Sequence, residues 1–272
     1  MSNLQLRVLF GVLGGAAVVG SLSWGVYGCL ALFLIISSFA RFEFYGLLKK
    51  AGRDPDILLG TILGTGLHLL SFAIEEDWLK PTALFLFFPG IAIVFIARLF
   101  RRTPPDPFGN TGLTLLGIIY TDLPFCLLYF GTTSPGTYDS RIILGSLFLL
   151  WASDTGAYFM GSNFGRTPLF PSVSPKKSWE GAAGALLSAL MVASVLARFW
   201  PVMPDIHWAV LSVIIVVIGS YGDLSESQFK RSLQIKDSGG GIPGHGGFLD
   251  RFDGLLPAAP FIVAYLKLVV FP

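Results

Sequence analysis

Residues 8–40 read VLFGVLGGAAVVGSLSWGVYGCLALFLIISSFA and contain no charged side chain. A helix needs about 20 mostly apolar residues to cross the hydrocarbon layer of a membrane, and runs of this kind recur along the whole chain. Of its 272 residues, 53% are apolar and 13% are charged, and the mean hydropathy is +0.68. A soluble domain carries about 25% charged residues, so the composition predicts an all-α, polytopic helical membrane protein.

Charges, Gly/Pro clusters and turn signals divide the apolar runs into nine predicted spans. They lie near residues 8–23, 25–45, 57–74, 81–98, 112–131, 142–161, 180–199, 206–223 and 255–271. The first division rests on length and on the Ser-Trp-Gly stretch around Trp24, and a single tilted helix over 8–45 is the alternative. Only Arg7 precedes the first run, which has no convincing cleavage site, so we expect a retained span and not a removed signal peptide.

Lys and Arg are unevenly divided between the two sets of loops that nine spans create. One side holds Arg7, Lys49, Lys50, Arg53, Arg101, Arg102, Arg166, Lys176, Lys177, Lys230, Arg231, Lys236 and Arg251. The opposite loops hold only Lys80, Arg141 and Arg198. Cytoplasmic loops are enriched in Lys and Arg. We therefore expect an integral protein of the bacterial inner (cytoplasmic) membrane, with the N-terminus and the basic loops 162–179 and 224–254 cytoplasmic and the C-terminus on the far side.

The turn-rich segment 103–110, TPPDPFGN, connects the fourth and fifth predicted spans. It suggests a division into N-terminal helices, 1–105, and a C-terminal catalytic region, 106–272. The net charge of +2 is too small to indicate a nucleic-acid partner. Cys29 and Cys126 lie in apolar runs with no second Cys or His beside them, so neither a disulfide nor a thiol metal site is expected.

Ionisable side chains gather in the predicted loop that spans residues 223–253. They are Asp223, Glu226, Lys230, Arg231, Lys236, Asp237, His245, Asp250, Arg251 and Asp253. A hydrated basic loop is the plain alternative, but these charges alternate in sign. They are also interleaved with GGGIPGHGG, whose glycines allow a backbone to approach a ligand closely. Ionisable groups near a membrane boundary are costly unless paired, hydrated or bound to an ion, so this segment is a candidate site.

The carboxylates of this segment have the pattern of a metal site. Asp250 and Asp253 are three residues apart at the expected start of the last helix, so both can point to the same spot. Asp223 ends a neighbouring span, where a simple interfacial stop is the alternative. Magnesium takes one or two carboxylates plus substrate phosphates, and the expected metal ligands are therefore Asp223, Asp250 and Asp253.

The cations of the segment suit a triphosphate, because Arg offers planar bidentate donors and Lys a compact charge. They are Lys230, Arg231, Lys236 and Arg251. Carboxylates for a metal and cations for phosphate together indicate phosphoryl or nucleotidyl transfer. His245 has a side chain that titrates near neutrality and could shuttle a proton or bind phosphate, or it could merely pack in a tight turn.

A second unusual region runs from WASDTGAYFMG to FGRTPLFPSVSPKKSWEG. Asp154 lies in an otherwise apolar span, where an acidic group is a functional hypothesis by default. Lys176 and Lys177 precede an expected helix start with Ser178 as N-cap and Glu180 in the first turn. A capped helix with basic flanks is the alternative to a role in the site.

The segment from Ser227 to Asp253 resembles the phosphatidate cytidylyltransferase (CDP-diacylglycerol synthase) family. The family signature is Ser, two residues, Lys-Arg, four residues, Lys-Asp, a Gly-rich turn with Pro-x-His-Gly-Gly, and Asp-Arg-x-Asp. Every fixed position is met, by Ser227, Lys230, Arg231, Lys236, Asp237, Pro243, His245, Gly246, Gly247, Asp250, Arg251 and Asp253. SYGDLSES, SDTGAYFMG, FGRTPLFP and SPKKSWEG are similar too, so the resemblance covers the C-terminal half.

The resemblance implies transfer of CMP from CTP to phosphatidic acid in the bilayer, giving CDP-diacylglycerol and pyrophosphate. It also implies a magnesium-dependent homodimer, with K⁺ as a candidate second ion. We expect catalytic roles for Asp223, Lys230, Arg231, Lys236, Asp250 and Arg251. We expect substrate binding by Asp154, Lys176, Lys177, Ser227, His245, Gly246 and Gly247.

Two other classes of protein are alternatives. A CDP-alcohol phosphotransferase also needs clustered aspartates, but its motif DG-x2-AR with a trailing G-x3-D-x3-D is not found in the chain. A transporter would use Asp122 and Asp154 as coupling residues within the membrane. It would leave the motif at 223–253 without a purpose.

Overall fold

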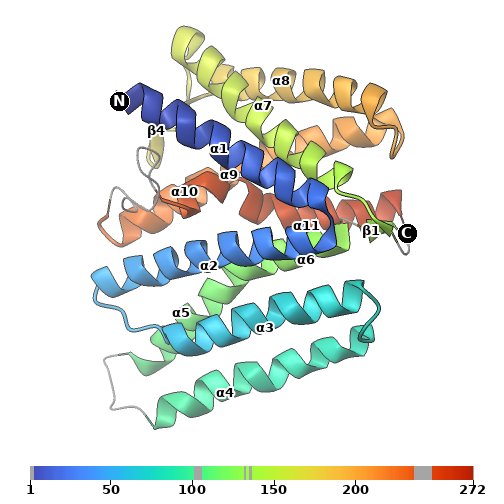
Figure 1. Ribbon diagram of the computed structural model, residues 1–272. Coiled ribbons are helices and arrows are strands. Elements are labelled where there is room, and N and C mark those ends of the chain that lie inside the picture. The colour runs from blue at the N-terminus through green and yellow to red at the C-terminus, as the bar shows by residue number, and fades with distance from the viewer. Residues whose placement is uncertain (1–2, 101–105, 132, 135–136, 236–246, 272) are drawn as a thin grey trace.

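Long helices dominate the computed structural model, which describes residues 3–100, 106–131, 133–134, 137–235 and 247–271 (Figure 1). They are α1 (Asn3–Trp24), α2 (Val26–Lys50), α3 (Ile57–Glu75), α4 (Phe87–Leu99), α5 (Pro107–Gly117), α6 (Leu123–Gly131), α7 (Arg141–Phe164), α8 (Trp179–Phe199), α9 (Asp205–Ser232), α10 (Leu249–Phe252) and α11 (Leu255–Tyr265). The 3-10 turn η1 (Pro81–Leu86) leads into α4, and the π-helical turns η2 (Ile118–Asp122) and η3 (Leu266–Val270) join α5 to α6 and extend α11.

Two small antiparallel hairpins interrupt the helices. β1 (Thr133–Ser134) pairs with β2 (Thr137–Tyr138), and β3 (Pro168–Phe170) pairs with β4 (Ser174–Ser178). The second hairpin lies inside the segment that the sequence predicts as a loop, 162–179. It is held to the next helix by Glu180, whose carboxylate accepts the backbone N–H groups of Arg166 and Thr167 at 3.1 and 3.2 Å.

The prediction of an all-α polytopic membrane protein is confirmed. Among the described residues, eight helical segments are long and apolar enough to cross a membrane, and α1 adds a shorter apolar stretch, Leu9–Trp24. Each predicted span therefore corresponds to a helix, and residues 8–45 form two helices, not one. The break falls at Gly25, whose φ of 123° lies in a region that only glycine adopts readily.

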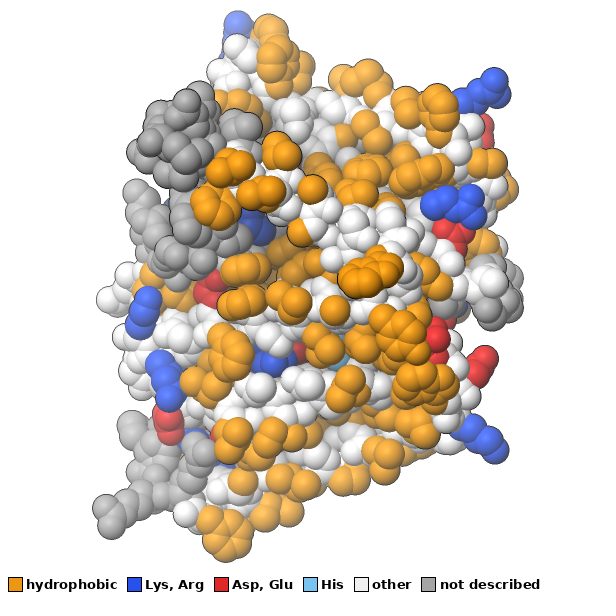
Figure 2. Space-filling model, in the orientation of Figure 1, with side chains coloured by type: hydrophobic (Ala, Val, Ile, Leu, Met, Phe, Trp, Pro, Cys, Tyr) orange, Lys and Arg blue, Asp and Glu red, His pale blue; other side chains and the backbone are white. Residues whose placement is uncertain are grey.

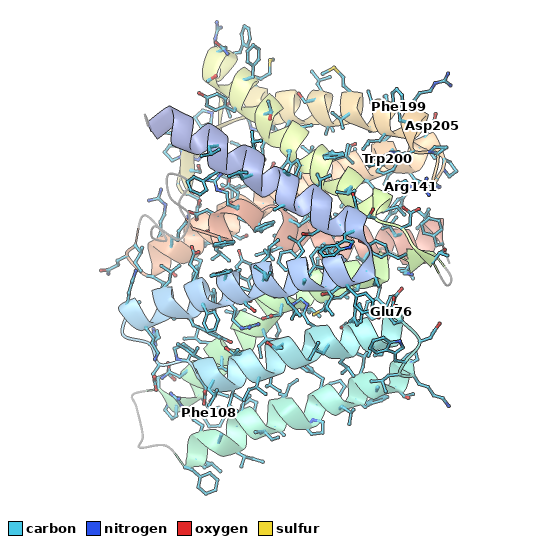
Figure 3. All side chains as sticks on the ribbon, viewed as in Figure 1. Glu76, Phe108, Arg141, Phe199, Trp200 and Asp205 are labelled. Carbon is cyan, nitrogen blue, oxygen red and sulfur yellow. The ribbon has the colours of Figure 1, made fainter. Side chains whose placement is uncertain are left out.

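The helix ends collect at two opposite ends of the bundle. Glu76, Arg141, Trp200 and Asp205 lie at one end and Phe108 at the other (Figure 3). Hydrophobic side chains cover the middle of the face shown in Figure 2, while most charged side chains there lie near its two edges. α10, β4 and the C-terminal turn of α9 share the end of Phe108 (Figure 1), which we call the motif end.

One hydrophobic core joins the two regions that the sequence separates at residue 105/106. Its large side chains include Phe33 and Phe44 of α2, Phe125 of α6, Trp208 of α9 and Leu256 of α11, each at most 2% exposed. α11 packs against both α6 and α9, and α2 contacts α10. A catalytic role confined to 106–272 stays a prediction.

The predicted loop 224–254 begins too early in the chain, by more than two helical turns. α9 continues to Ser232, so residues 224–232 are helical and not part of a loop. Hydropathy marks where a helix leaves the membrane, but backbone hydrogen bonding continues into water where the side chains permit it. Lys230 and Arg231 occupy the last turn, where positive charge is favourable near a helix C-terminus.

Candidate active site

The last turns of α9 present alternating charges on one face, because residues three and four apart in a helix are neighbours. Ser227 Oγ lies 3.5 Å from Asp223 Oδ1. The Lys230 ammonium is 3.3 Å from Glu226 Oε1 and donates to Asp250 Oδ1 at 2.7 Å. Lys230 therefore joins α9 to the short helix α10.

The segment around α10 supplies the second row of carboxylates. Asp250 Oδ2 accepts the backbone N–H of Gly247 at 3.2 Å, and Asp253 Oδ1 accepts that of Gly254 at 2.7 Å. The carboxyl group of Glu226 lies against those of Asp250 and Asp253. The prediction that Asp250 and Asp253 begin the last membrane helix is confirmed.

Gly222 allows α9 to approach this second row. A Cβ at Gly222 would overlap the backbone oxygen of Asp253 and the ring of Pro257. Any larger residue would push α9 away from the segment 253–257. The glycine thus brings the carboxylates of the two helices together.

The hairpin β3–β4 forms a further wall of the cluster. Lys177 makes an ion pair with Asp223 and donates to the carbonyl oxygen of Ser220 at 3.3 Å. Lys176 is exposed, because successive residues of a strand point to opposite faces. Asp154 of α7 interacts electrostatically with Asp223, Lys177 and Arg251. The structure therefore brings Asp154 and Lys177 to the motif.

The remaining predicted site residues are less central or lie outside the described part of the chain. Arg231 donates from Nε to the carbonyl oxygen of Val173 at 3.1 Å, so it faces the hairpin and not the carboxylates. Arg251 is exposed, and Gly247 is buried next to Asp250. The predicted site residues Lys236, His245 and Gly246, and the signature residues Asp237 and Pro243, lie outside the described residues.

Two residues to which the sequence assigned no role also belong to the cluster. Glu226 is only 1% exposed, and the strongest electrostatic neighbours of Tyr120 in η2 are Glu226, Asp253 and Asp223. The spacing of Glu226, three residues after Asp223 and four before Lys230, would have indicated its position had the helix been extended past residue 223. Tyr120 comes from a distant helix, and no sequence signal points to it.

The side chains of the cluster suit a magnesium ion in their chemistry, since all the acidic donors are carboxylate oxygens. Among the described residues, no group of three or more His, Cys, Asp or Glu side chains is gathered for a metal. Asp223 and Asp250 are instead paired with lysines. The buried Tyr120 hydroxyl has no hydrogen-bond partner among the described residues. The set thus fits an ion held by one or two carboxylates and by phosphate.

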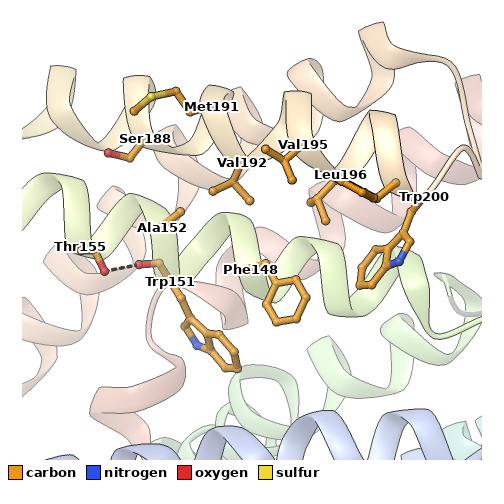
Figure 4. Close-up of a pocket in the computed structure, with 11 residues that line it drawn as sticks. Phe148, Trp151, Ala152, Thr155, Ser188, Met191, Val192, Val195, Leu196 and Trp200 are labelled. Carbon is orange, nitrogen blue, oxygen red and sulfur yellow. Dashed lines mark hydrogen bonds between the residues drawn. The ribbon is translucent and has the colours of Figure 1, made fainter.

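A groove between α7 and α8 is not part of this cluster (Figure 4). Its volume is about 740 Å³, and its lining is mostly apolar, including Phe148, Trp151, Val192 and Trp200. The Thr155 hydroxyl donates to the carbonyl oxygen of Trp151 at 2.8 Å and is satisfied within α7. No ionisable side chain lines the groove, so it does not suit a nucleotide triphosphate.

A helical membrane bundle with interleaved acids and bases at one end is the arrangement expected of a membrane enzyme that acts on phosphate-containing substrates. The chain matches the cytidylyltransferase family over residues 5–269. It belongs to this family and is a nucleotidyltransferase.

Two similar proteins match nearly the whole chain, and a third matches less than half of it. A phosphatidate cytidylyltransferase of Bacillus subtilis is 32% identical over 98% of this chain and 99% of its own length. A phosphatidate cytidylyltransferase of Haemophilus influenzae is 34% identical over 92% of this chain and 86% of its own length. One from Mycobacterium bovis is 46% identical over 44% of this chain and 39% of its own length.

Proposed function

We propose that the protein is a phosphatidate cytidylyltransferase, which transfers CMP from CTP to phosphatidic acid and releases pyrophosphate. The observation that carries the proposal is the cluster in which Lys177 pairs with Asp223, and Lys230 with Asp250 and Glu226. The cluster lies at a helix-bundle end, where a lipid headgroup and a soluble nucleotide can meet. The family and the names of the similar proteins support the same reaction.

The chemistry requires one bond to form and one to break. A phosphate oxygen of phosphatidic acid attacks the α-phosphorus of CTP, and the bond from that phosphorus to the oxygen bridging to the β-phosphate breaks. The electron pair leaves with pyrophosphate. Since the attacking oxygen is already ionised at neutral pH, no strong general base is needed, and bringing two anions together is the main difficulty.

In this proposal, the basic side chains reduce the repulsion between the two anionic substrates. Lys230 and Arg251 neutralise the triphosphate and the departing pyrophosphate, and Lys177 binds the phosphate of the lipid at the membrane boundary. Roles for Arg231, Lys236 and His245 in the same binding stay predictions. The Tyr120 hydroxyl and the half-exposed Ser227 hydroxyl are additional hydrogen-bond donors near the carboxylates of the cluster.

Magnesium would be held by one or two of the three carboxylates of Asp223, Asp250 and Asp253, beside Glu226, together with substrate phosphate. When bound it would neutralise negative charge on the phosphates. The lysine pairs at Asp223 and Asp250 hold these carboxylates in place. A potassium ion and a homodimer, both implied by the resemblance, stay predictions.

The test is an assay of the purified chain in detergent with labelled CTP and phosphatidic acid. We expect CDP-lipid and pyrophosphate in equal amounts, loss of both with a chelator, and recovery with added magnesium. Omission of phosphatidic acid is the control. Pyrophosphate release that does not depend on the lipid, or formation of product from labelled CDP-lipid instead of CTP, would refute the proposed reaction.

We further propose that the motif end faces the cytoplasm of a bacterium and that the protein lies in the inner membrane. The bias of Lys and Arg toward the loops of that end supports this orientation. Asp205 and Ser232, at the two ends of α9, offer a matched pair of exposed sites, and the native Cys29 and Cys126 are buried. In cells whose outer barrier is permeabilised, Asp205→Cys is expected to react with an impermeant thiol reagent, and Ser232→Cys only after lysis. The reverse pattern would overturn the orientation.

A further inference from the structure

Glu43 of α2 contacts the segment that carries the last part of the family signature. Its Oε2 accepts the backbone N–H of Phe248 at 2.6 Å and lies 3.5 Å from the backbone nitrogen of Leu249. These residues immediately precede Asp250, whose own carboxylate accepts the N–H of Gly247. A carboxylate that accepts backbone N–H groups makes charge-assisted bonds, which are stronger than neutral ones.

Aromatic contacts from two nearby residues of α2 reinforce this attachment. Phe39, four residues before Glu43, stacks on Phe248 with ring centroids 4.7 Å apart. Phe44, the residue after Glu43, stacks on Phe229 of α9 at 4.8 Å. α2 therefore contacts both parts of the cluster, the end of α9 and the segment of α10, although it lies about 200 residues away in the chain.

We propose that Glu43 is a positioning residue for cytidylyl transfer, which holds residues 248–253 in the register that places Asp250 beside Lys230 and Asp253 beside Glu226. This inference rests on the proposed function. Glu43 acts through the backbone of Phe248 and not on the substrates. Without the Glu43 carboxylate, the backbone N–H of Phe248 loses its acceptor. Residues 248–253 are then free to shift along α9.

The test compares the full-length Glu43→Ala and Glu43→Gln variants with the wild type and with Glu76→Ala. Glu76 is a partly exposed glutamate at the opposite end of the bundle. For each protein, kcat, the KM for CTP, the magnesium concentration that gives half-maximal rate, and the rise in Tm caused by magnesium alone are measured.

For Glu43→Ala we expect kcat to fall on the order of 10²-fold, because a misplacement of about 1 Å can cost that much. The KM for CTP is expected to change little, the half-maximal magnesium concentration to rise, and the magnesium-induced rise in Tm to shrink. Glu43→Gln keeps an acceptor oxygen and should recover part of kcat. Glu76→Ala should behave as the wild type does.

A Glu43→Ala protein with a lowered Tm but with unchanged kcat and magnesium dependence would overturn the inference, because Glu43 would then serve stability alone. Equal loss in Glu43→Gln and Glu43→Ala would also contradict it. If Glu43→Ala does not fold, the Glu43→Gln protein decides by the same measurements. A wild-type protein that forms no CDP-lipid would refute the proposed function, and the effect of magnesium on Tm would then decide the role of Glu43 separately.

Discussion

Two clusters of ionisable side chains in this protein differ in how completely they are enclosed. The inner cluster consists of Arg41, His68 and Asp122, and all three side chains are 0% exposed. Arg41 and Asp122 form an ion pair, and His68 Nε2 is 3.5 Å from Asp122 Oδ1. The Thr121 hydroxyl adds a hydrogen bond to Asp122 at 3.1 Å. No charge of the inner cluster is open to a ligand.

The cluster at the motif end is open by comparison. Lys177 and Asp223 are 27% and 42% exposed, and Lys230 and Asp250 are 15% and 23% exposed. A charge pair sealed inside a membrane bundle must stay together, because each ion alone is costly there. A partly exposed pair can exchange one partner for a phosphate. Paired acids and bases therefore join α2 to η2 in one place and form the proposed site in the other.

The largest effect is expected from removing a carboxylate of the open cluster. Asp250→Ala should lower the rate of CDP-lipid formation on the order of 10³-fold, because it removes the partner of Lys230 and a proposed metal ligand. The rate is measured on protein that elutes as a single folded species in gel filtration. Substantial activity in both Asp250→Ala and Asp223→Ala would contradict the proposal that these aspartates hold the metal ion.

Breaking the inner cluster should affect stability and not chemistry. Arg41→Met leaves Asp122 buried without its ion pair, which typically costs about 3–5 kcal/mol of unfolding free energy. The double variant Arg41→Met/Asp122→Leu removes both charges and should be more stable than the single variant. Denaturant unfolding in detergent measures both. If Arg41→Met kept its stability and lost its activity, the division between the two clusters would be wrong.

The two adjacent lysines of β4 should differ in effect. Lys177 pairs with Asp223, whereas Lys176 is exposed on the strand. Lys177→Ala should raise the KM for phosphatidic acid on the order of tenfold, the size of one charge-assisted contact. Lys176→Ala, the matched control, should raise it much less. A larger effect of Lys176→Ala would mean that the hairpin presents its opposite face to the lipid.

The smallest effect is expected at an exposed pair far from both clusters. Asp139 accepts hydrogen bonds from the side chain of Arg141, which lowers the pKa of that carboxyl group. A lowered pKa contributes stability above the unfolded value, about 3.9, and the contribution is lost as the pH falls through the folded value. Asp139→Asn should therefore lower the free energy of unfolding at pH 7 by less than about 1 kcal/mol, and Tm should fall slightly. The difference from wild type should vanish in acid. A difference that persists or grows as the pH falls would contradict this assignment.

Much of the candidate site could be read from the chain before its structure. The signature residues Lys230 and Asp250 do meet, because they lie on the two helices that flank one connection. The sequence could not show which of the two lysines, Lys176 or Lys177, contacts the cluster, because this depends on which face of β4 turns inward. Glu226 was misplaced in a loop because hydropathy does not report where a helix ends in water.

The sequence by itself determined the nine apolar helical segments that the described residues contain, and it indicated the chemistry proposed for the motif. A segment crosses a membrane because of its own length and apolarity, and a signature is a local string; both are properties of neighbouring residues. Only the tertiary structure decided that Glu43 contacts the motif, that Tyr120 lies in the electrostatic field of its carboxylates, and that Asp122 lies sealed against Arg41. Which helix faces which depends on packing summed over the whole bundle. Nothing in the local sequence indicates that residues 81 or 205 positions apart are in contact.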